Sequence, residues 1–561
     1  MESERTTDFT TAVKTAVPRS IIVLAATVAG SILSLPPSSR VLAEGLYADD
    51  AFYYFEIAVN LVNGYGITFD TINPTNGFQV IWLLMLIPVA AVVTNPDDFV
   101  AVVWWMQVLL GAGAAGLTFV LADSLGPRSR TWIPSAIIIS SLPFLPLWNG
   151  GMVNGLETPS FTIALLVSLL LLQYFRVSPS TMSAWILAAS LTLTVLSRLD
   201  GLLFVGLTGI AIWLWRSGTA PQRLQVLVLP AVVSALYFTA NLLFFGSLSP
   251  VSGATKTIWG ERALQAAIDG GMSEWRLRLS NIAWPKQYLD PLTSALPESL
   301  SNGPIFDMTV VLAVIVSYAG IAWIYWRKAI PVLAIFQVFL VGKFLVYGYF
   351  QFGYANYIWY WTLDLIGLVL FVAVLTQGLL TRRQTMETSA AFAVMAAFLA
   401  FGIIGNSLIE RGRDWLSPDP ITGEIAEYAG SKYAAETLND SPVTRDLLMT
   451  SSDAGILGFY LKGPLVNMDG LVNGRQRLDL TRLHGGDQLP YLQSHPEFDG
   501  FVNWVPTSAT LDRMERVGFV EVPSFAECAA DAHGVVSNDR GQIRLFLRPR
   551  LAAAWDCPAR Q

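Results

Sequence analysis

The chain has 561 residues, of which 53% are hydrophobic and only 14% are charged, and its mean hydropathy is +0.49. Soluble proteins carry about 25% charged residues, so this composition excludes an ordinary soluble protein and indicates that most of the chain lies in lipid. The net charge of −7 and the lack of any basic run argue against nucleic-acid binding.

Charge is distributed unevenly along the chain, because 35 of the 77 charged side chains lie in the last 151 residues. This shift predicts a polytopic α-helical membrane domain at 1–410 and a soluble C-terminal domain at 411–561. Short helical and strand-like runs in the soluble domain favour an α/β or α+β fold. Its two cysteines, Cys528 and Cys557, are expected to form a disulfide if this domain faces an oxidising compartment.

Apolar runs long enough to cross a bilayer predict about eleven transmembrane helices. They lie near 20–37, 98–122, 132–148, 158–175, 182–197, 201–215, 224–245, 305–326, 330–349, 358–380 and 388–408. A further run at 78–94 is interpreted as a juxtamembrane helix of the first outer loop, because only then do the basic loops all fall on one side. The basic residues of these loops are Arg128/Arg130, Arg176, Arg216/Arg223, Arg327/Lys328 and Arg382/Arg383. Positive charge marks cytoplasmic loops, so the N-terminus is expected inside and the C-terminal domain outside.

The first outer loop, residues 38–97, contains YADDAFYYFEIAVNLVNGYG at 47–66, where Asp49 and Asp50 open an apparent helix. Two carboxylates at a membrane surface can be explained in two ways. They can stabilise the helix N-terminus, where acidic side chains are favoured. They can instead include a general base for an acceptor hydroxyl, with Tyr53 on the next turn helping to shape the substrate site.

Two further motifs place charged residues at the predicted outer ends of spans. Glu157 lies in NGLETPSF, where it is either a helix N-terminal charge or a second catalytic carboxylate. SRLDG contains Arg198 and Asp200, which can neutralise each other or present an arginine to a phosphate.

Two later segments complete the set of candidates. Lys256, in GSLSPVSGATKT at 246–257, is either a solvated surface lysine or an anion ligand among small residues with accessible amides. The segment 451–475 contains Asp453 and Asp469 around a glycine-rich apolar run. Its pattern favours a βαβ-like core element over direct participation in catalysis.

In this order, the segments ADDAFYYFEIAVNLVNGYGITFD, NPTNGF, LETPSF, SRLDG, GSLSPVSGATK and DAGILGFYLKGPLVNMDGLVN resemble the GT-C superfamily of integral-membrane glycosyltransferases. The resemblance covers nearly the whole chain. It is strongest to the branch that contains cell-wall arabinofuranosyltransferase-like and protein mannosyltransferase-like enzymes. It implies an inverting enzyme of the cell membrane that moves a sugar from a polyprenyl-phosphate donor to a hydroxyl of a glycan, glycolipid or protein on the outer face.

The resemblance also assigns roles to individual residues. Asp49 corresponds to the general base, while Asp50 and Glu157 are expected to shape the acceptor site. Lys256 corresponds to the donor-phosphate ligand, and Arg198 is the second cation available for it. Tyr53, Asn76 of NPTNGF and Asp200 are expected to shape the substrate site. No cofactor is firmly implied, and the need for a divalent cation is left open.

Two other classes of function fit the composition. A lipid-linked-sugar transporter or flippase also has many spans, and Lys343 and Asp364 lie inside predicted spans, as charged residues of transporters do. A non-catalytic glycan-binding assembly protein is the third class. The lack of an evident internal repeat and the position of most acidic residues at span ends favour the enzyme.

Overall fold

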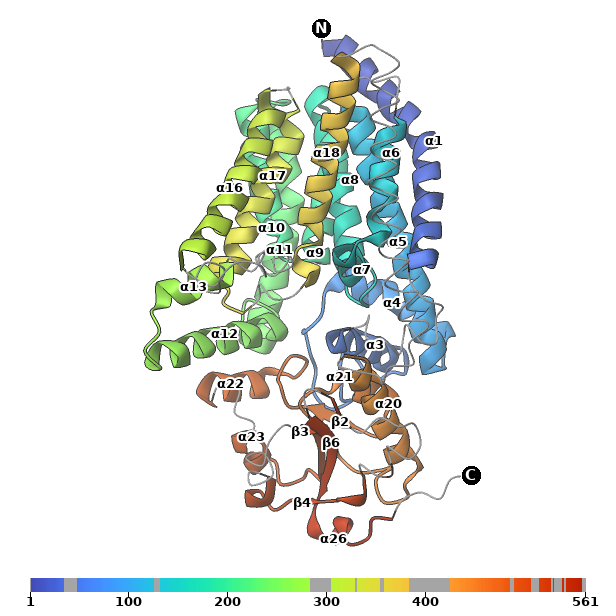
Figure 1. The fold of residues 1–561 in the computed structure, drawn as a ribbon, viewed down its shortest axis with the longest axis vertical. Helices are drawn as coiled ribbons and strands as arrows, with labels where there is room; N and C mark the ends of the chain where they lie inside the picture. The colour runs from blue at the N-terminus through green and yellow to red at the C-terminus, as the bar shows by residue number, and fades with distance from the viewer. Residues whose placement is uncertain are drawn as a thin grey trace.

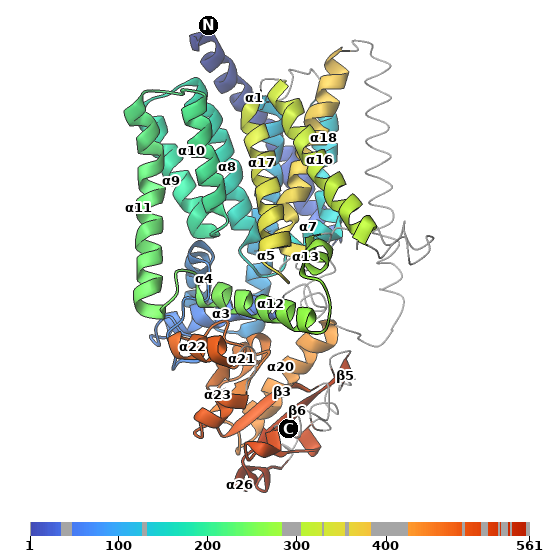
Figure 2. The same cartoon turned by 90° about the vertical axis from the view of Figure 1, so that its left-hand side faces the viewer.

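The computed structural model describes residues 2–34, 48–125, 132–282, 304–327, 330–353, 358–382, 424–484, 489–505, 514–525, 528, 537–538 and 541–556. A bundle of long helices forms one end of the molecule, and the C-terminal domain with its small sheet forms the other (Figures 1 and 2). The helices α3 and α12 lie between these two parts, across the direction of the bundle helices.

The bundle is built from helices that follow the apolar runs of the sequence. They are α1 (Glu2–Ser34), α5 (Pro96–Leu125), α6 (Ile133–Ser140), α8 (Thr158–Val177), α9 (Thr181–Ser197), α10 (Gly201–Leu214), α11 (Ala220–Phe245), α16 (Pro304–Arg327), α17 (Pro331–Leu345) and α18 (Thr362–Arg382). Six described helices are long and apolar enough to cross a membrane, and α6, α9, α10 and α18 are among the shorter apolar helices. Ten of the eleven predicted runs therefore correspond to helices, and the run at 388–408 lies outside the described residues.

The run predicted at 132–148 is interrupted in the structure. It consists of α6, the 3₁₀ turn η1 (Leu142–Phe144) and the start of α7 (Pro146–Met152). Pro143 and Pro146 explain the interruption, because proline lacks the N–H that continues a helix and restricts the residue before it. Three further short elements accompany the bundle: α4 (Val80–Val92), the π-helical turn η3 (Val346–Phe350) and the 3₁₀ turn η5 (Ile358–Tyr360).

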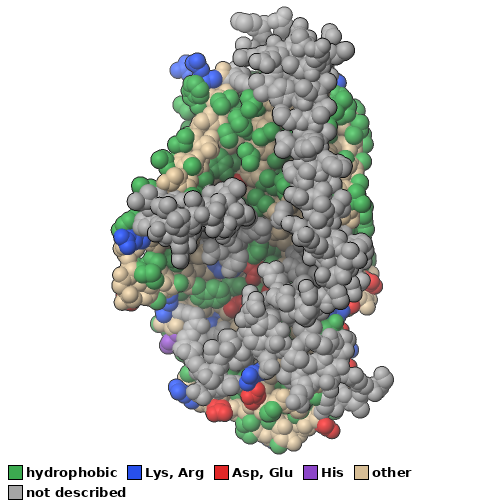
Figure 3. Space-filling model, in the orientation of Figure 1, with side chains coloured by type: hydrophobic (Ala, Val, Ile, Leu, Met, Phe, Trp, Pro, Cys, Tyr) green, Lys and Arg blue, Asp and Glu red, His purple; other side chains and the backbone are tan. Residues whose placement is uncertain are grey.

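Successive bundle helices alternate in direction, so the N-terminus and the loops after α8 and α10 lie at the end away from the C-terminal domain (Figures 1 and 2). The guanidinium of Arg176, at the end of α8, lies 5.4 Å from the ring of Trp215, just after α10. This end carries the basic residue Arg176, and the assignment of this end to the cytoplasmic side stays a prediction. In Figure 3 hydrophobic side chains predominate over the described part of the bundle, whereas acidic side chains are concentrated towards the C-terminal domain.

The C-terminal domain contains a mixed sheet with the strand order β2-β1-β3-β6-β4, and β5 also pairs with β6. Its strands are β1 (Met449–Ser451), β2 (Leu465–Asn467), β3 (Gly500–Val505), β4 (Val520–Glu521), β5 (Ser537–Asn538) and β6 (Gly541–Leu547). Its described helices are α20 (Glu424–Asp440), α21 (Gly455–Tyr460), α22 (Arg475–His484), α23 (Leu489–Ser494) and α26 (Pro549–Ala552). Strands β1 and β2 are parallel and flank α21, which confirms the predicted βαβ element.

Aromatic packing joins the C-terminal domain to the helix α3 (Asp49–Val62). Phe459 of α21 lies 5.6 Å from Phe52, 5.7 Å from Phe55 and 5.6 Å from Phe99, measured between ring centroids. Phe52, Phe55 and Phe99 are each at most 1% exposed. Burying such rings contributes about 1.5–3 kcal/mol each, so the two parts share one apolar core.

Two predictions concern features at or beyond the edge of the described residues. Cys528 is disulfide-bonded, as expected, and the only other cysteine of the sequence, Cys557, lies outside the described residues. The predicted domain boundary near residue 410 also lies outside them.

Candidate functional site

The two adjacent carboxylates at the start of α3 point to different partners. Consecutive helical residues are rotated by about 100°, so Asp49 and Asp50 cannot face the same way. The Asp49 carboxylate accepts hydrogen bonds from the backbone N–H groups of Gly455 (3.0 Å) and Ile456 (2.8 Å) at the start of α21. A Cβ at Gly455 would lie 2.2 Å from the Asp49 carbonyl oxygen, so this close approach requires glycine. Asp49 thus joins α3 to the C-terminal domain.

Asp50 instead forms an ion pair with Lys256, with 2.7 Å between Nζ and Oδ2. Lys256 lies on α12 (Val251–Asp269), 206 residues further along the chain. The side chains of Lys256 and Asp50 remain 14% and 27% exposed, so a ligand can reach the pair. The structure therefore brings together two of the residues singled out in the sequence.

Asn76 positions the helix that carries Lys256. Its side-chain oxygen accepts the backbone N–H of Val251 (3.0 Å), and its amide donates to Asn241 Oδ1 (2.9 Å). Helix α11 ends at Gly246, whose φ of 66° is the left-handed conformation that glycine adopts readily. Asn76 is 7% exposed, so the structure gives this predicted substrate-shaping residue a role in holding α11 and α12 together.

Glu157 lies at the N-terminus of α8 and faces the same region. Its carboxylate is 3.5 Å from Arg198 Nη1 and accepts a hydrogen bond from the Tyr54 hydroxyl at 3.3 Å. Glu157 is 7% exposed and makes no side-chain cap bond to α8, so its position is explained by these two partners and not by helix capping. Tyr54 follows Asp50 by one helical turn and so connects Glu157 to the start of α3.

Arg198 is 4% exposed. Its Nε and Nη2 atoms donate hydrogen bonds to the two carboxylate oxygens of Asp200, each at 3.2 Å. Nη2 also donates to the Tyr347 hydroxyl (3.3 Å), which donates to Asp200 (3.1 Å). The guanidinium packs 4.9 Å from the centre of the Tyr360 ring. The two carboxylates that contact it neutralise this buried charge, which favours a structural role for the Arg198–Asp200 pair over free binding of a phosphate.

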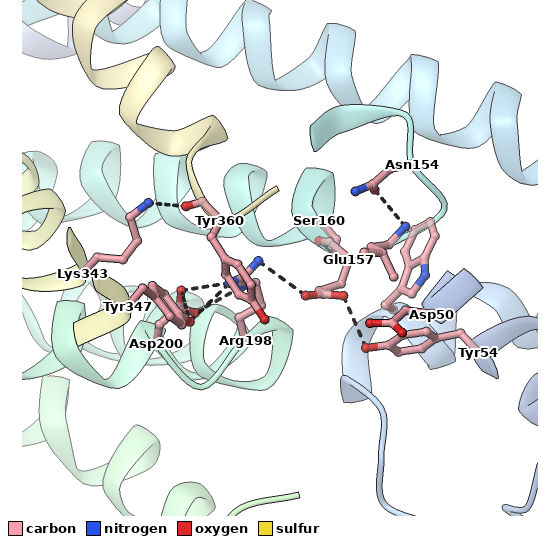
Figure 4. A network of polar contacts seen from close by, with 12 residues as sticks. Asp50, Tyr54, Asn154, Glu157, Ser160, Arg198, Asp200, Lys343, Tyr347 and Tyr360 are labelled. Carbon is pink, nitrogen blue, oxygen red and sulfur yellow. Dashed lines mark hydrogen bonds and ion pairs between the residues drawn. The ribbon is translucent and has the colours of Figure 1, made fainter. Parts of the chain in front are cut away.

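Tyr360 lies beside Arg198, and Glu157 lies between Arg198 and the Asp50–Tyr54 side of the site (Figure 4). The charges that act on the Tyr360 hydroxyl are those of Lys256, Arg198, Glu157 and Asp50. All four charged residues therefore lie close enough to act on one hydroxyl. Asp50, Glu157, Arg198 and Lys256 converge from α3, α8, the α9–α10 turn and α12, although they are up to 206 residues apart.

The two charged residues predicted inside spans pair with each other. The Lys343 ammonium donates to the Asp364 carboxylate and to the Tyr360 carbonyl oxygen, and Tyr318 also donates to Asp364. Lys343 of α17, Asp364 of α18 and Tyr318 of α16 thus link three helices. Lys343 lies near Arg198 and Tyr347 (Figure 4). Buried charges in a membrane bundle require such partners.

The sequence-based interpretation missed one part of the site, which the C-terminal domain supplies. The Tyr53 hydroxyl donates to Asp469 Oδ2 (3.0 Å) and accepts from the Asn467 amide (2.7 Å). Asp469 was noticed as part of the βαβ element, but one sequence contains no signal that brings it to a helix more than 400 residues away. Tyr53 is the predicted residue that contacts it.

The sequence leaves open whether a divalent cation takes part in the reaction. Within the described part of the chain, no three His, Cys, Asp or Glu residues are placed to hold a metal ion together. The divalent cation left open by the sequence thus has no assigned ligands.

Comparisons with known proteins found no matching family model and no matching curated protein. Among solved structures, the apo oligosaccharyltransferase of Archaeoglobus fulgidus has a TM-score of 0.49 at 11% identity, covering 87% of this chain and 69% of that one. The same enzyme with an inhibitory peptide and a dolichol-phosphate has a TM-score of 0.45 at 12% identity, covering 86% and 69%. ArnT of Cupriavidus metallidurans in the apo state has a TM-score of 0.41 at 13% identity, covering 95% and 98%. Similarities at this level are too weak to assign the chain a family or an activity.

Proposed function

We propose that this protein is a membrane glycosyltransferase that moves a sugar from a polyprenyl-phosphate donor to an acceptor hydroxyl, with inversion, at the outer surface of the membrane. The observation that carries the proposal is the Asp50–Lys256 ion pair, which is short and partly exposed and lies where the apolar bundle meets the C-terminal domain. A phosphate that leaves from a lipid needs a cation, and an acceptor hydroxyl needs a base.

The ion pair suggests how the two groups act in turn. When the donor binds, its phosphate competes with Asp50 for the Lys256 ammonium, and the Asp50 carboxylate is released. In the transfer step the acceptor O–H bond breaks and its proton goes to Asp50. The acceptor oxygen bonds to the anomeric carbon, while the bond from that carbon to the phosphate oxygen breaks and its electron pair leaves with the phosphate. Lys256 stabilises that developing charge.

This assignment changes two of the roles expected from sequence. Asp50, and not Asp49, is proposed as the base, because both Asp49 oxygens accept amide N–H groups of α21. Lys256 keeps its role as phosphate ligand, whereas Arg198 is proposed to hold Glu157 in place. Glu157 keeps its proposed role at the acceptor site, beside Tyr54.

The test uses the full-length protein in proteoliposomes, with polyprenyl phosphates carrying a radiolabelled pentose or hexose. Asp50→Asn is expected to lower kcat by about 10²–10⁴-fold, the usual contribution of a general base, with little change in donor binding. Lys256→Ala is expected to weaken donor binding by about 10–100-fold, because it removes a charge-assisted contact of roughly 1.5–3 kcal/mol.

Lys432→Ala is the matched control, because Lys432 of α20 forms an equally short ion pair (2.7 Å) with Asp97 of α5, which likewise joins two separate parts of the chain. Its transfer activity is expected to stay close to that of the wild type. Wild-type activity in both Asp50→Asn and Lys256→Ala would contradict the proposal. If the liposomes moved labelled lipid between leaflets without any sugar transfer, the flippase alternative would replace it.

A further inference from the structure

A loop of the C-terminal domain, residues 468–474 between β2 and α22, is held against three segments of the membrane domain. The Asn467 amide, just before it, donates to the Tyr53 hydroxyl of α3 (2.7 Å), and the Thr255 hydroxyl of α12 donates to the Gly470 carbonyl (3.2 Å). At Gly77 an added Cβ would lie 2.1 Å from the Leu471 carbonyl oxygen. No side chain fits there, so the loop and the first outer loop are in direct backbone contact.

These contacts place the loop beside the Asp50–Lys256 pair. Tyr53 lies three residues after Asp50 on α3, and residues at this spacing share one helix face. Thr255 directly precedes Lys256 on α12. Near Asp50, Tyr53 therefore hydrogen-bonds to Asn467, which directly precedes the loop, and next to Lys256, Thr255 hydrogen-bonds to Gly470 within the loop.

Asp469 is the charged residue of this loop, and it is partly exposed. Its Oδ1 accepts the Leu471 N–H (2.8 Å), and its Oδ2 accepts the Tyr53 hydroxyl (3.0 Å). Each carboxylate oxygen has two lone pairs, so both can accept one more hydrogen bond. Neither of these two contacts requires an acidic residue here, because an asparagine could accept the Leu471 amide equally well.

We propose that the C-terminal domain completes the acceptor side of the active site, where Asp469 accepts a hydrogen bond from a second hydroxyl of the acceptor next to Asp50. The inference rests on the proposed function. Two carboxylates on neighbouring elements suit the adjacent hydroxyls of a sugar, so the acceptor class is a glycan. A serine or threonine side chain offers only one hydroxyl.

The charges around Asp469 make its role measurable by pH. It is faced by Asp50 and Tyr53 of α3 and by Asp453 before α21, while Lys256 of α12 is paired with Asp50. The pKa of Asp469 is raised to about 7, mainly by burial; Asp50 and Asp453 also act to raise it, whereas the Leu471 amide and the Tyr53 hydroxyl act to lower it. If the ionised carboxylate binds the acceptor, transfer falls as the pH decreases through this value.

The experiment compares wild type, Asp469→Asn and the control Asp446→Asn, an exposed residue of the same domain, in proteoliposomes with a labelled polyprenyl-phosphate sugar. The acceptor probes are an octyl disaccharide and a threonine-containing peptide. Asp469→Asn is expected to raise the KM for the disaccharide at least tenfold, to leave the KM for the donor unchanged, and to lose the acidic limb near pH 7. A merely structural role predicts no change in the pH profile, because asparagine keeps the Leu471 contact.

Tyr53→Phe provides a second readout if Asp469→Asn does not fold. Without the phenol donor, the Asp469 carboxylate loses a hydrogen bond that stabilises its ionised form, so the acidic limb of the pH–activity profile should move to higher pH. Asp469→Glu keeps a carboxylate at this position and should recover part of the transfer activity. The inference would be overturned if Asp469→Asn kept the acidic limb of its pH–activity profile and Tyr53→Phe did not shift it, or if the enzyme transferred sugar to the peptide alone. If Asp50→Asn is inactive while Asp469→Asn behaves as wild type, only this inference fails. Full activity in Asp50→Asn would contradict the proposed function itself.

Discussion

At the residue scale, the sequence identifies the charged side chains of the site but not their partners. Asp49 and Asp50 are identical neighbours in the chain, and only the rotation of α3 sends one to α21 and the other to Lys256. The Asp50–Lys256 contact spans 206 residues, and no periodicity in one sequence predicts it. Arg198 and Asp200 are the exception, because two residues this close can pair locally, and the alternative of mutual neutralisation was evident from SRLDG.

Glu56 gives a prediction at this scale. Burial raises the pKa of this α3 residue to about 8, although a hydrogen bond with Asn60 lowers it. Because the folded-state pKa lies above the unfolded value, the contribution to stability is fully present below about pH 4.5 and is lost as the pH rises through 8. Glu56→Gln removes this loss, so its Tm relative to wild type should be more favourable at pH 9 than at pH 5.

The measurement is thermal unfolding of the detergent-solubilised protein followed by tryptophan fluorescence. Glu261→Gln, at an exposed position of α12, is the control and should show the same Tm difference at both pH values. If the Tm difference between Glu56→Gln and the wild type were the same at pH 5 and at pH 9, the claim that burial raises the pKa of Glu56 would be contradicted.

At the element scale, hydropathy predicted most helices because a bilayer imposes one requirement on every span, namely about 20 apolar residues. The break in 132–148 follows from Pro143 and Pro146, which the hydropathy pattern does not register. The loop 468–474 was not predicted as part of the site, because its position depends on how the C-terminal domain docks onto α3 and α12.

The contact between α3 and α21 provides the prediction at this scale. Asp49→Asn leaves one acceptor oxygen for two amide donors, so one N–H at the start of α21 loses its charge-assisted partner at a cost of roughly 1.5–3 kcal/mol. We expect a lower Tm and a transfer activity at least tenfold above that of Asp50→Asn. Differential scanning fluorimetry and the proteoliposome assay measure these two effects. Asp49→Asn with an unchanged Tm and no activity would instead restore Asp49 as the base.

At the scale of the whole molecule, the alternation of basic loops predicts that α12 and the C-terminal domain lie outside and that the loop between α8 and α9 lies inside. Glu261 of α12 and Thr181 at the start of α9 are exposed. Glu261→Cys should react with a membrane-impermeant maleimide added to intact cells, whereas Thr181→Cys should react only after permeabilisation. Labelling in the opposite order would reverse the topology and place the site on the cytoplasmic side.

The same scale explains why the function can be proposed from so few residues. In a chain that is 14% charged, the charges of Asp50, Lys256, Glu157 and Arg198 all act on the Tyr360 hydroxyl, near the junction of the bundle and the C-terminal domain. Under the proposed function, the apolar bundle accommodates the prenyl chain, and the junction supplies the charges for the phosphate and the acceptor.

The most direct test of this account is a cryo-EM structure of the wild-type protein with a polyprenyl phosphate. The account predicts a phosphate oxygen within hydrogen-bond distance, about 2.7–3.2 Å, of Lys256 Nζ, with the Asp50 carboxylate separated from Lys256 and open to the acceptor side. A phosphate bound elsewhere in the bundle, with the Asp50–Lys256 pair intact, would contradict it.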